Sequence, residues 1–179
     1  MKVDAYGWLN GVKRIASSNF DMRPARTKIS LLVIHNISLP PDEFGGEGIC
    51  QLFTNTLDCS AHPYYEKLAG LKVSSHFLIR RDGSVVQFVP CSRRAWHAGV
   101  SEWRGVSRCN DYAIGIELEG SDFVAFESPQ YRALAKLTRL LKRRYPIRDI
   151  VGHSDIAPSR KTDPGPFFDW ERYLKLVEK

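Results

Sequence analysis

Apolar and polar positions along this chain follow two periods, one typical of strands and one typical of helices. The apolar run at residues 31–35 predicts a buried strand that ends in His35. Residues 113–119 alternate strictly, so three aliphatic side chains share one face of a strand and Glu117 and Glu119 share the other. Both segments are short enough to be strands of one sheet.

Turn signals divide the rest of the chain. Asp82-Gly83 predicts a tight hairpin between strands at residues 75–81 and 84–89. A further short strand is expected at residues 149–152. Segments rich in glycine or proline predict long loops, which often bind ligands, at residues 36–48, 91–110 and 153–167.

The helical period is clearest over residues 128–144, where large apolar side chains recur every three or four positions. Ser128 is the expected N-cap, Pro129 the first helical residue and Pro146 the stop. Shorter helices are expected over 49–57, after His62-Pro63 and after Asp169, the last with Phe168 and Tyr173 as a hydrophobic staple. Strands and helices are mixed, which predicts an α/β fold with one mixed sheet flanked by helices.

Composition narrows the class of protein. The 179 residues are 43% hydrophobic and 26% charged, which suits one globular domain over 1–179. The apolar runs are far shorter than the ~20 residues that cross a bilayer. The first residues lack a signal-peptide pattern, so we expect a cytoplasmic protein without membrane contact. The four cysteines form no C-x-x-C pair and are expected to be free thiols.

The net charge of +6 favours an acidic partner, such as nucleic acid, an anionic lipid surface or an anionic small substrate. A basic solvated surface explains the charge equally well. The densest cationic run, Lys142-Arg143-Arg144, ends an expected helix, where cations suit the helix dipole. Because no nucleic-acid-binding motif accompanies the charge, we expect no nucleic-acid partner. No obligate protein partner is evident either.

Two histidines stand where expected strands enter loops. His35 ends the first strand, His153 follows a late strand, and Asp163 lies ten residues further on. Two imidazoles and one carboxylate would leave the fourth position of a tetrahedral zinc site open for water, as in catalytic zinc sites. Spacing alone does not settle this, because any two histidines and an aspartate can be combined in this way.

Glu117 and Lys161 add to the chemistry near these residues. A carboxylate on a central strand must be paired or functional, because a buried charge is otherwise unfavourable. Beside zinc, Glu117 could take the proton of a bound water, and Lys161 could stabilise charge on a carbonyl oxygen. An edge position for Glu117 and a solvated position for Lys161 remain open.

The other histidines have simpler interpretations. His62, before Pro63, is expected in a loop or a helix cap. His76 alternates with apolar residues, which favours a hydrogen-bonded core position. His97 follows Trp96 in a glycine-bearing loop, which could line a cleft.

Taken together, the motifs resemble the cytosolic 1,6-anhydro-N-acetylmuramoyl-L-alanine amidases of peptidoglycan recycling, the AmpD type of the zinc N-acetylmuramoyl-L-alanine amidase family. The resemblance runs from about Gly7 to Tyr173 and implies the fold that this family shares with peptidoglycan recognition proteins. Seven ordered motifs carry it, beginning at His35, Glu43, Ser75, Ala95, Gly115, Gly152 and Lys161.

This resemblance implies zinc bound by His35, His153 and Asp163, with Glu117 and Lys161 in catalysis. It implies cleavage of the amide between 1,6-anhydro-N-acetylmuramic acid and L-alanine in an anhydromuropeptide, a substrate that also signals β-lactamase induction. The substrate contacts it implies are Asn36, Lys72, Ala95, Trp96, His97 and Arg108. Lys72 stands where the family has arginine, which keeps the charge and loses the bidentate fork.

Two further features favour the recycling branch. Phage lysozyme-like amidases and peptidoglycan recognition proteins commonly carry tyrosine where this chain has Ser75, and they lack an acid where it has Glu117. Three alternatives remain, of which the first two are a lytic amidase that acts on intact peptidoglycan and a muropeptide sensor that binds without chemistry. A nucleic-acid binder is the last alternative.

Overall fold

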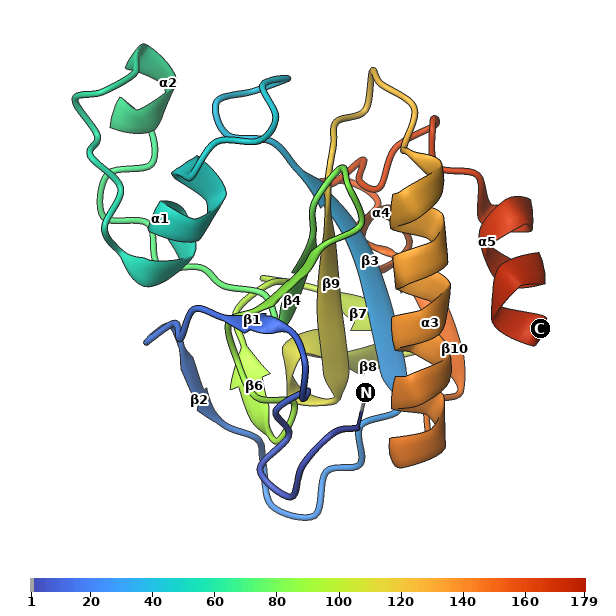
Figure 1. Cartoon of the computed structure of the whole chain (residues 1–179). Coiled ribbons are helices and arrows are strands. Elements are labelled where there is room, and N and C mark those ends of the chain that lie inside the picture. The colour runs from blue at the N-terminus through green and yellow to red at the C-terminus, as the bar shows by residue number, and fades with distance from the viewer. Residues whose placement is uncertain (1) are drawn as a thin grey trace.

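A six-stranded mixed sheet organises the computed structural model, which describes residues 2–179 (Figure 1). Four neighbouring strands, β4, β9, β3 and β10, run parallel, whereas β5 pairs antiparallel with β4 and parallel with β1. In spatial order the strands are β1 (Lys13–Arg14), β5 (Val85–Gln87), β4 (Phe77–Ile79), β9 (Ala113–Glu119), β3 (Leu31–Ile37) and β10 (Asp149–Gly152). The expected mixed sheet flanked by helices is confirmed.

One face of the sheet packs against α3 (Ser128–Arg144), and α5 (Trp170–Glu178) packs beside α3 (Figure 1). The apolar stripe of α3, including Leu134 and Leu141, meets the even-numbered side chains of β3 and β9, such as Ile34 and Ile116. These side chains are fully buried, and each contributes about 1.5–3 kcal/mol by leaving water. This face holds the main hydrophobic core.

The opposite face holds two smaller apolar clusters, and the odd-numbered side chains of β3 and β9 point toward it. One cluster packs α1 (Gly48–Thr54) and α2 (Pro63–Glu66) against β4 and β5. The remaining elements on the chain are two small sheets and two single turns: β2 (Phe20–Met22) with β6 (Arg93–Ala95), β7 (Glu102–Trp103) with β8 (Val106–Ser107), η1 (Cys109–Asp111) and α4 (His153–Ile156).

Several predicted elements are confirmed with their bounds, namely the strands at 113–119 and 149–152 and the helix at 128–144. The hairpin at Asp82-Gly83 is also confirmed, with shorter strands. The strand expected at 31–35 is longer, because its pairing with β9 continues to Ile37 and leaves His35 inside the strand.

Other expectations were wrong in their details. The loop at 91–110 contains β6, which pairs with the distant β2, and β7 and β8, which form a short hairpin with each other. The loop at 153–167 begins with the one-turn helix α4. The N-cap of α3 is Glu127 rather than Ser128, and its backbone N–H donates to Gln130 Oε1 at 2.9 Å. Helix α1 ends before residue 57 because Asn55 takes a left-handed conformation.

Smaller expectations are confirmed. His62 caps α2 by accepting a hydrogen bond from Tyr64 N at 3.1 Å. The staple rings of Phe168 and Tyr173 lie 5.7 Å apart between centroids. All four cysteines are free. Within residues 2–179, no helix combines the length and the apolar composition that crossing a membrane requires.

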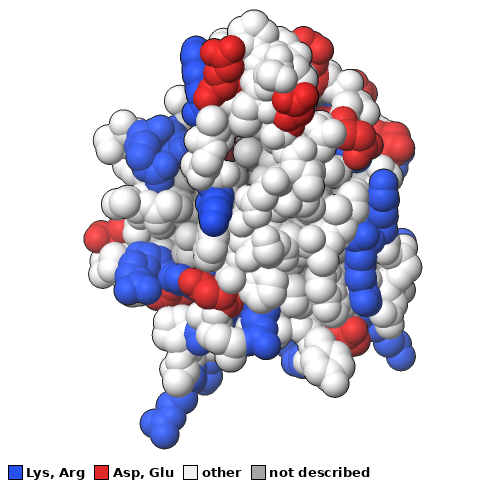
Figure 2. All heavy atoms as spheres, turned by 90° about the vertical axis from the view of Figure 1, so that its left-hand side faces the viewer, with Lys and Arg blue, Asp and Glu red and all other residues white. Residues whose placement is uncertain are grey.

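Surface charge is dispersed on the face that carries α1 and α2. Figure 2 shows Lys and Arg side chains there in several groups, with Asp and Glu side chains beside some of these groups and toward the top of the face. The excess of basic residues therefore forms no single basic patch on this face.

Candidate active site

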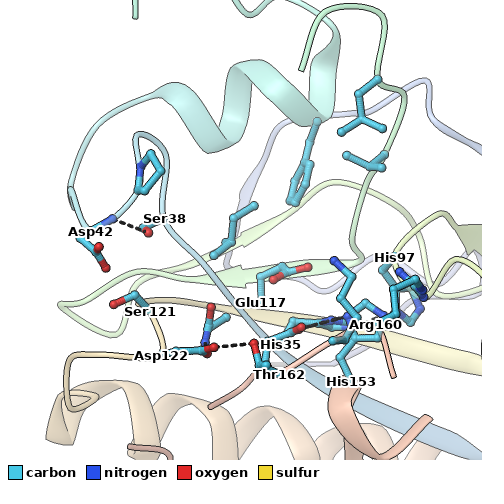
Figure 3. Close-up of a pocket in the computed structure, with 18 of the residues that line it drawn as sticks. His35, Ser38, Asp42, His97, Glu117, Ser121, Asp122, His153, Arg160 and Thr162 are labelled. Atoms are coloured by element: carbon cyan, nitrogen blue, oxygen red, sulfur yellow. Dashed lines mark hydrogen bonds and ion pairs between the residues drawn. The ribbon is translucent and has the colours of Figure 1, made fainter. Parts of the chain in front are cut away.

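The carboxyl ends of three parallel strands bring the candidate residues together. The register pairs His35 of β3 with Glu117 of β9. It also pairs Ile34 with Gly152, the last residue of β10, so His153 follows directly beside His35. Ligand sites in open sheets form at this edge, where strands end and loops begin. Figure 3 shows His35, His153 and Glu117 at the base of the resulting cleft.

His35, His153 and Asp163 converge on one point. His35 Nδ1 lies 3.0 Å from His153 Nδ1 and 2.9 Å from Asp163 Oδ2, and His153 Nδ1 lies 3.1 Å from the same oxygen. These separations approach the roughly 3.3 Å edge of a tetrahedron with Zn–N distances of about 2.0–2.1 Å. The three residues are a possible metal site, and their donor set fits zinc.

The pKa shifts of His35 and Asp163 suit metal binding. Burial lowers the pKa of His35, which keeps its imidazole neutral. Burial alone would raise the pKa of Asp163, but hydrogen bonds to His153 and His35 outweigh it and lower that pKa. A neutral imidazole and an ionised carboxylate are the forms that ligate a cation.

Local packing explains how Asp163 reaches the histidines. A side chain at Gly152 would lie 2.7 Å from Pro164 Cδ, so glycine lets the following loop approach the end of β10. Ser154 N then donates to Asp163 O at 2.9 Å. Asn36 Nδ2 donates to Pro164 O at 3.0 Å, which ties the end of β3 to the same loop.

Glu117 is a buried carboxylate without a direct partner. Its residue is 7% exposed, and within residues 2–179 its side chain makes no hydrogen bond or ion pair. Burial raises its pKa well above the ordinary value, the negative charge of Asp163 raises it further, and the positive charge of Lys161 opposes them. A group of this kind holds and releases protons at pH values nearer neutrality than an ordinary carboxylate.

These residues line a cleft of about 520 Å³. Lys161 is half-buried in its wall, on the loop between α4 and Asp163. The floor carries the charged and titratable groups, whereas the rim includes exposed apolar side chains, among them Tyr64, Leu71 and Phe123. The floor of the cleft is thus polar, and its mouth combines these apolar side chains with the exposed charged residues Asp42 and Arg160.

The expected substrate contacts divide into two groups. Asn36, Trp96 and His97 line the cleft. The other three do not: Ala95 is fully buried, Lys72 is exposed beside a separate hollow, and Arg108 is exposed and paired with Asp111 at 3.2 Å.

Several residues of the cleft were missed in the sequence, among them Asp122 and Arg160. Asp122 Oδ1 accepts from Asn36 Nδ2 at 2.7 Å, and its other oxygen accepts from Thr162, so it joins the ends of β3 and β9 to the Asp163 loop. Arg160 Nη2 donates to Ala98 O at 2.8 Å. A carboxylate directly after a strand end and a cation beside Lys161 were the available signals.

Comparison with known proteins shows which sequences this chain is similar to. The sequence profile of the N-acetylmuramoyl-L-alanine amidase family matches residues 25–166. The chain is 56% identical to "1,6-anhydro-N-acetylmuramyl-L-alanine amidase AmpD" of Escherichia coli K12, over 97% of this chain and 96% of that protein. It is 50% identical to the protein of that name from Haemophilus influenzae, over 96% and 95%.

Solved structures give the same picture. A crystal structure of a selenomethionine AmpD derivative superposes with a TM-score of 0.96 at 56% identity, covering 99% of both chains. The E. coli amidase AmiD was solved in complex with anhydro-N-acetylmuramic acid-L-Ala-D-γ-Glu-L-Lys. It superposes with a TM-score of 0.60 at 32% identity, covering 89% of this chain and 66% of that one.

Proposed function

The chain belongs to the N-acetylmuramoyl-L-alanine amidase family, and we infer that it hydrolyses the amide between 1,6-anhydro-N-acetylmuramic acid and the L-alanine of the stem peptide. The structural observation that carries this function is the convergence of a His-His-Asp cluster and an unpaired buried glutamate at the floor of one cleft. The enzyme acts in peptidoglycan recycling, as an amidohydrolase.

We assign the metal site to His35, His153 and Asp163. Zinc, when bound there, supplies a Lewis acid that polarises the amide carbonyl and activates water. The two imidazoles and the carboxylate contribute one negative charge, which balances part of the charge of the cation. The buried positions of both histidines hold these donors in place before substrate binds.

Glu117 and Lys161 then divide the proton and charge chemistry. Glu117 accepts the proton of the attacking water and passes it to the departing amine of L-alanine, a role that suits its raised pKa. Lys161 faces the same cleft and stabilises the negative charge that develops on the carbonyl oxygen. Neither side chain makes an ion pair within residues 2–179, so both are free for these roles.

The substrate has a sugar and a peptide that carries carboxylates. We propose that Asn36 and Trp96 form the wall on the sugar side, with the fully buried Ala95 supporting Trp96, and that Lys72 and Arg108 attract the acidic stem peptide from outside the cleft. His97 was expected among these contacts, but its contact with His35 indicates a different role. Residues 1–179 form one amidase domain in this proposal, and residence in the cytoplasm stays a prediction that cell fractionation checks.

Mass spectrometry of the products from anhydromuramoyl-tripeptide, with and without EDTA, tests this function. We expect free tripeptide that EDTA abolishes and zinc restores. The Glu117→Gln variant, loaded with zinc, is the matched control and should release almost none. A zinc-loaded wild type that releases no tripeptide would contradict the proposal and favour a sensor.

Purified sacculi provide the second arm of this experiment. Release of peptides from intact peptidoglycan at a rate similar to that from the anhydromuropeptide would favour a lytic amidase. We expect strong preference for the anhydro substrate, in line with the names of two relatives that match almost the whole chain.

A further inference from the structure

Residues 97 and 98 contact both candidate ligand histidines on the side of each ring that faces away from Asp163. His35 Nε2 lies 2.9 Å from His97 Nδ1, and His153 Nε2 lies 3.1 Å from Ala98 O. The opposite ring atoms, both Nδ1, are those that converge with Asp163. Neighbouring residues 97 and 98 therefore face the outer nitrogens of both imidazoles.

These contacts bear on which ring nitrogen carries the proton. A backbone carbonyl only accepts, so Ala98 O requires the proton of His153 on Nε2 and leaves Nδ1 with a lone pair. The contact at His35 is less determined, because His97 Nδ1 can donate or accept. His35 can ligate through Nδ1 as a neutral imidazole only when His97 accepts the Nε2 proton.

Accepting at Nδ1 has a consequence for His97 itself. A neutral imidazole holds one proton, so that of His97 must then lie on Nε2. This atom is buried and has no hydrogen-bond partner within residues 2–179. It is also inaccessible, which argues against a direct hydrogen bond from His97 to substrate. A buried polar atom without a partner is uncommon in native proteins and calls for a functional explanation.

The surrounding structure holds the His97 ring in place. Asn110 Oδ1 accepts from the backbone nitrogens of His97 at 3.2 Å and Ala98 at 2.9 Å. The ring lies against β9, where a side chain at Gly115 would come within 2.5 Å of His97 Cγ. Glycine in a central strand has no packing advantage, and here it makes room for the imidazole.

We propose that His97 is a positioning residue that sets the tautomer and orientation of His35 as a metal ligand, in place of the substrate contact expected from the sequence. This inference rests on the metal site in the proposed function. Removing such a partner of a ligand histidine typically weakens metal binding about 10- to 100-fold. Ala98 O performs the equivalent task for His153.

Zinc affinity, measured by competition with a chromophoric chelator, tests this role without relying on turnover. His97→Leu removes the acceptor, and we expect its zinc Kd to rise about 10- to 100-fold. His97→Asn retains an oxygen near the position of Nδ1, and we expect its Kd to stay within about threefold of wild type. Circular dichroism of each metal-free variant verifies its fold.

Equal Kd values for wild type and His97→Leu would overturn the inference, and so would equal weakening in both variants. Nitrogen-15 NMR of the zinc-loaded wild type is independent of variant folding. It should show the protons of His35 and His97 on Nε2, and a proton on Nδ1 of His97 would overturn the inference. A wild type that binds no zinc would overturn this inference and the proposed metal site together, whereas normal zinc binding with an unaffected His97→Leu would overturn this inference alone.

Discussion

Glu117 and Glu119 lie two residues apart on the same face of β9, and both are buried, yet their surroundings are opposite. Glu119 pairs with Arg80 at 2.8 Å and accepts from the backbone nitrogens of Gly45 at 2.8 Å and Arg81 at 3.1 Å. Glu117 has no such partner, and burial raises its pKa. Glu119 is 1% exposed and Glu117 is 7% exposed, so burial alone does not distinguish the two glutamates.

The difference shows how the same residue type serves structure at one position and chemistry at the next. The partners of Glu119 neutralise its charge and tie residues 45–47 to the sheet. Glu117 is left with an unfavourable charge, which the protein tolerates beside a cluster suited to a cation. A buried carboxylate is therefore a better candidate for catalysis when its polar partners are absent.

The largest effect should follow from Glu117→Gln. Without a group that accepts the proton of water, we expect kcat to fall about 10²- to 10⁴-fold, with zinc content and fold retained. Steady-state release of tripeptide measures kcat, and metal analysis measures the zinc content. Glu119→Gln provides the comparison, and a loss of kcat as large as that of Glu117→Gln would remove the distinction between the two glutamates.

Lys161→Met tests the cation that acts on the same site as Glu117. Loss of its charge should lower kcat about 10²- to 10³-fold, as for removal of one group that stabilises an oxyanion. Zinc binding should persist, because Lys161 is not a ligand. A variant that turns over normally would assign Lys161 to the solvated surface.

Glu119→Gln should affect stability rather than turnover. Breaking this buried pair leaves Arg80 without its main partner, and we expect the free energy of unfolding in urea to fall by about 3 kcal/mol. Glu127→Gln is the matched control, since its ion pair with Arg81 is exposed and should contribute less than about 1 kcal/mol. Equal losses would argue against a structural role specific to Glu119.

In the metal-free protein, Glu117→Gln should raise stability, and this gain should be smaller than the loss expected for Glu119→Gln. The folded pKa of Glu117 is raised, so stability is lost as pH rises above the unfolded value near 4.5. Glu117→Gln cannot ionise, and we expect its Tm to exceed that of wild type by a few degrees at pH 7. The difference should vanish near pH 4, and a gain independent of pH would point to packing instead.

Arg108→Ala should have the smallest effect. This side chain is exposed and paired with Asp111, so we expect KM for the tripeptide substrate to rise less than about tenfold, with kcat unchanged. An unchanged KM would remove Arg108 from the substrate contacts.

Local sequence patterns predicted many of the helices and strands of this protein. The strict alternation at 113–119, the Asp82-Gly83 turn and the apolar stripe at 128–144 predicted their elements because neighbouring residues alone decide which face is buried. The sequence also indicated His35, His153 and Asp163 as one possible zinc site, because the two histidines lie at expected strand ends and Asp163 lies in a proline-rich loop.

Tertiary structure decided what each of these residues meets. Strand register places Glu117 beside His35, and Gly152 admits the loop that carries Asp163. Alternation puts Glu117 and Glu119 on one face without distinguishing them, because their difference depends on Arg80 and Gly45, which are distant in sequence. His97 likewise acquires its place from Asn110 and Gly115, since hydrogen bonds and close packing arise only when separate segments meet.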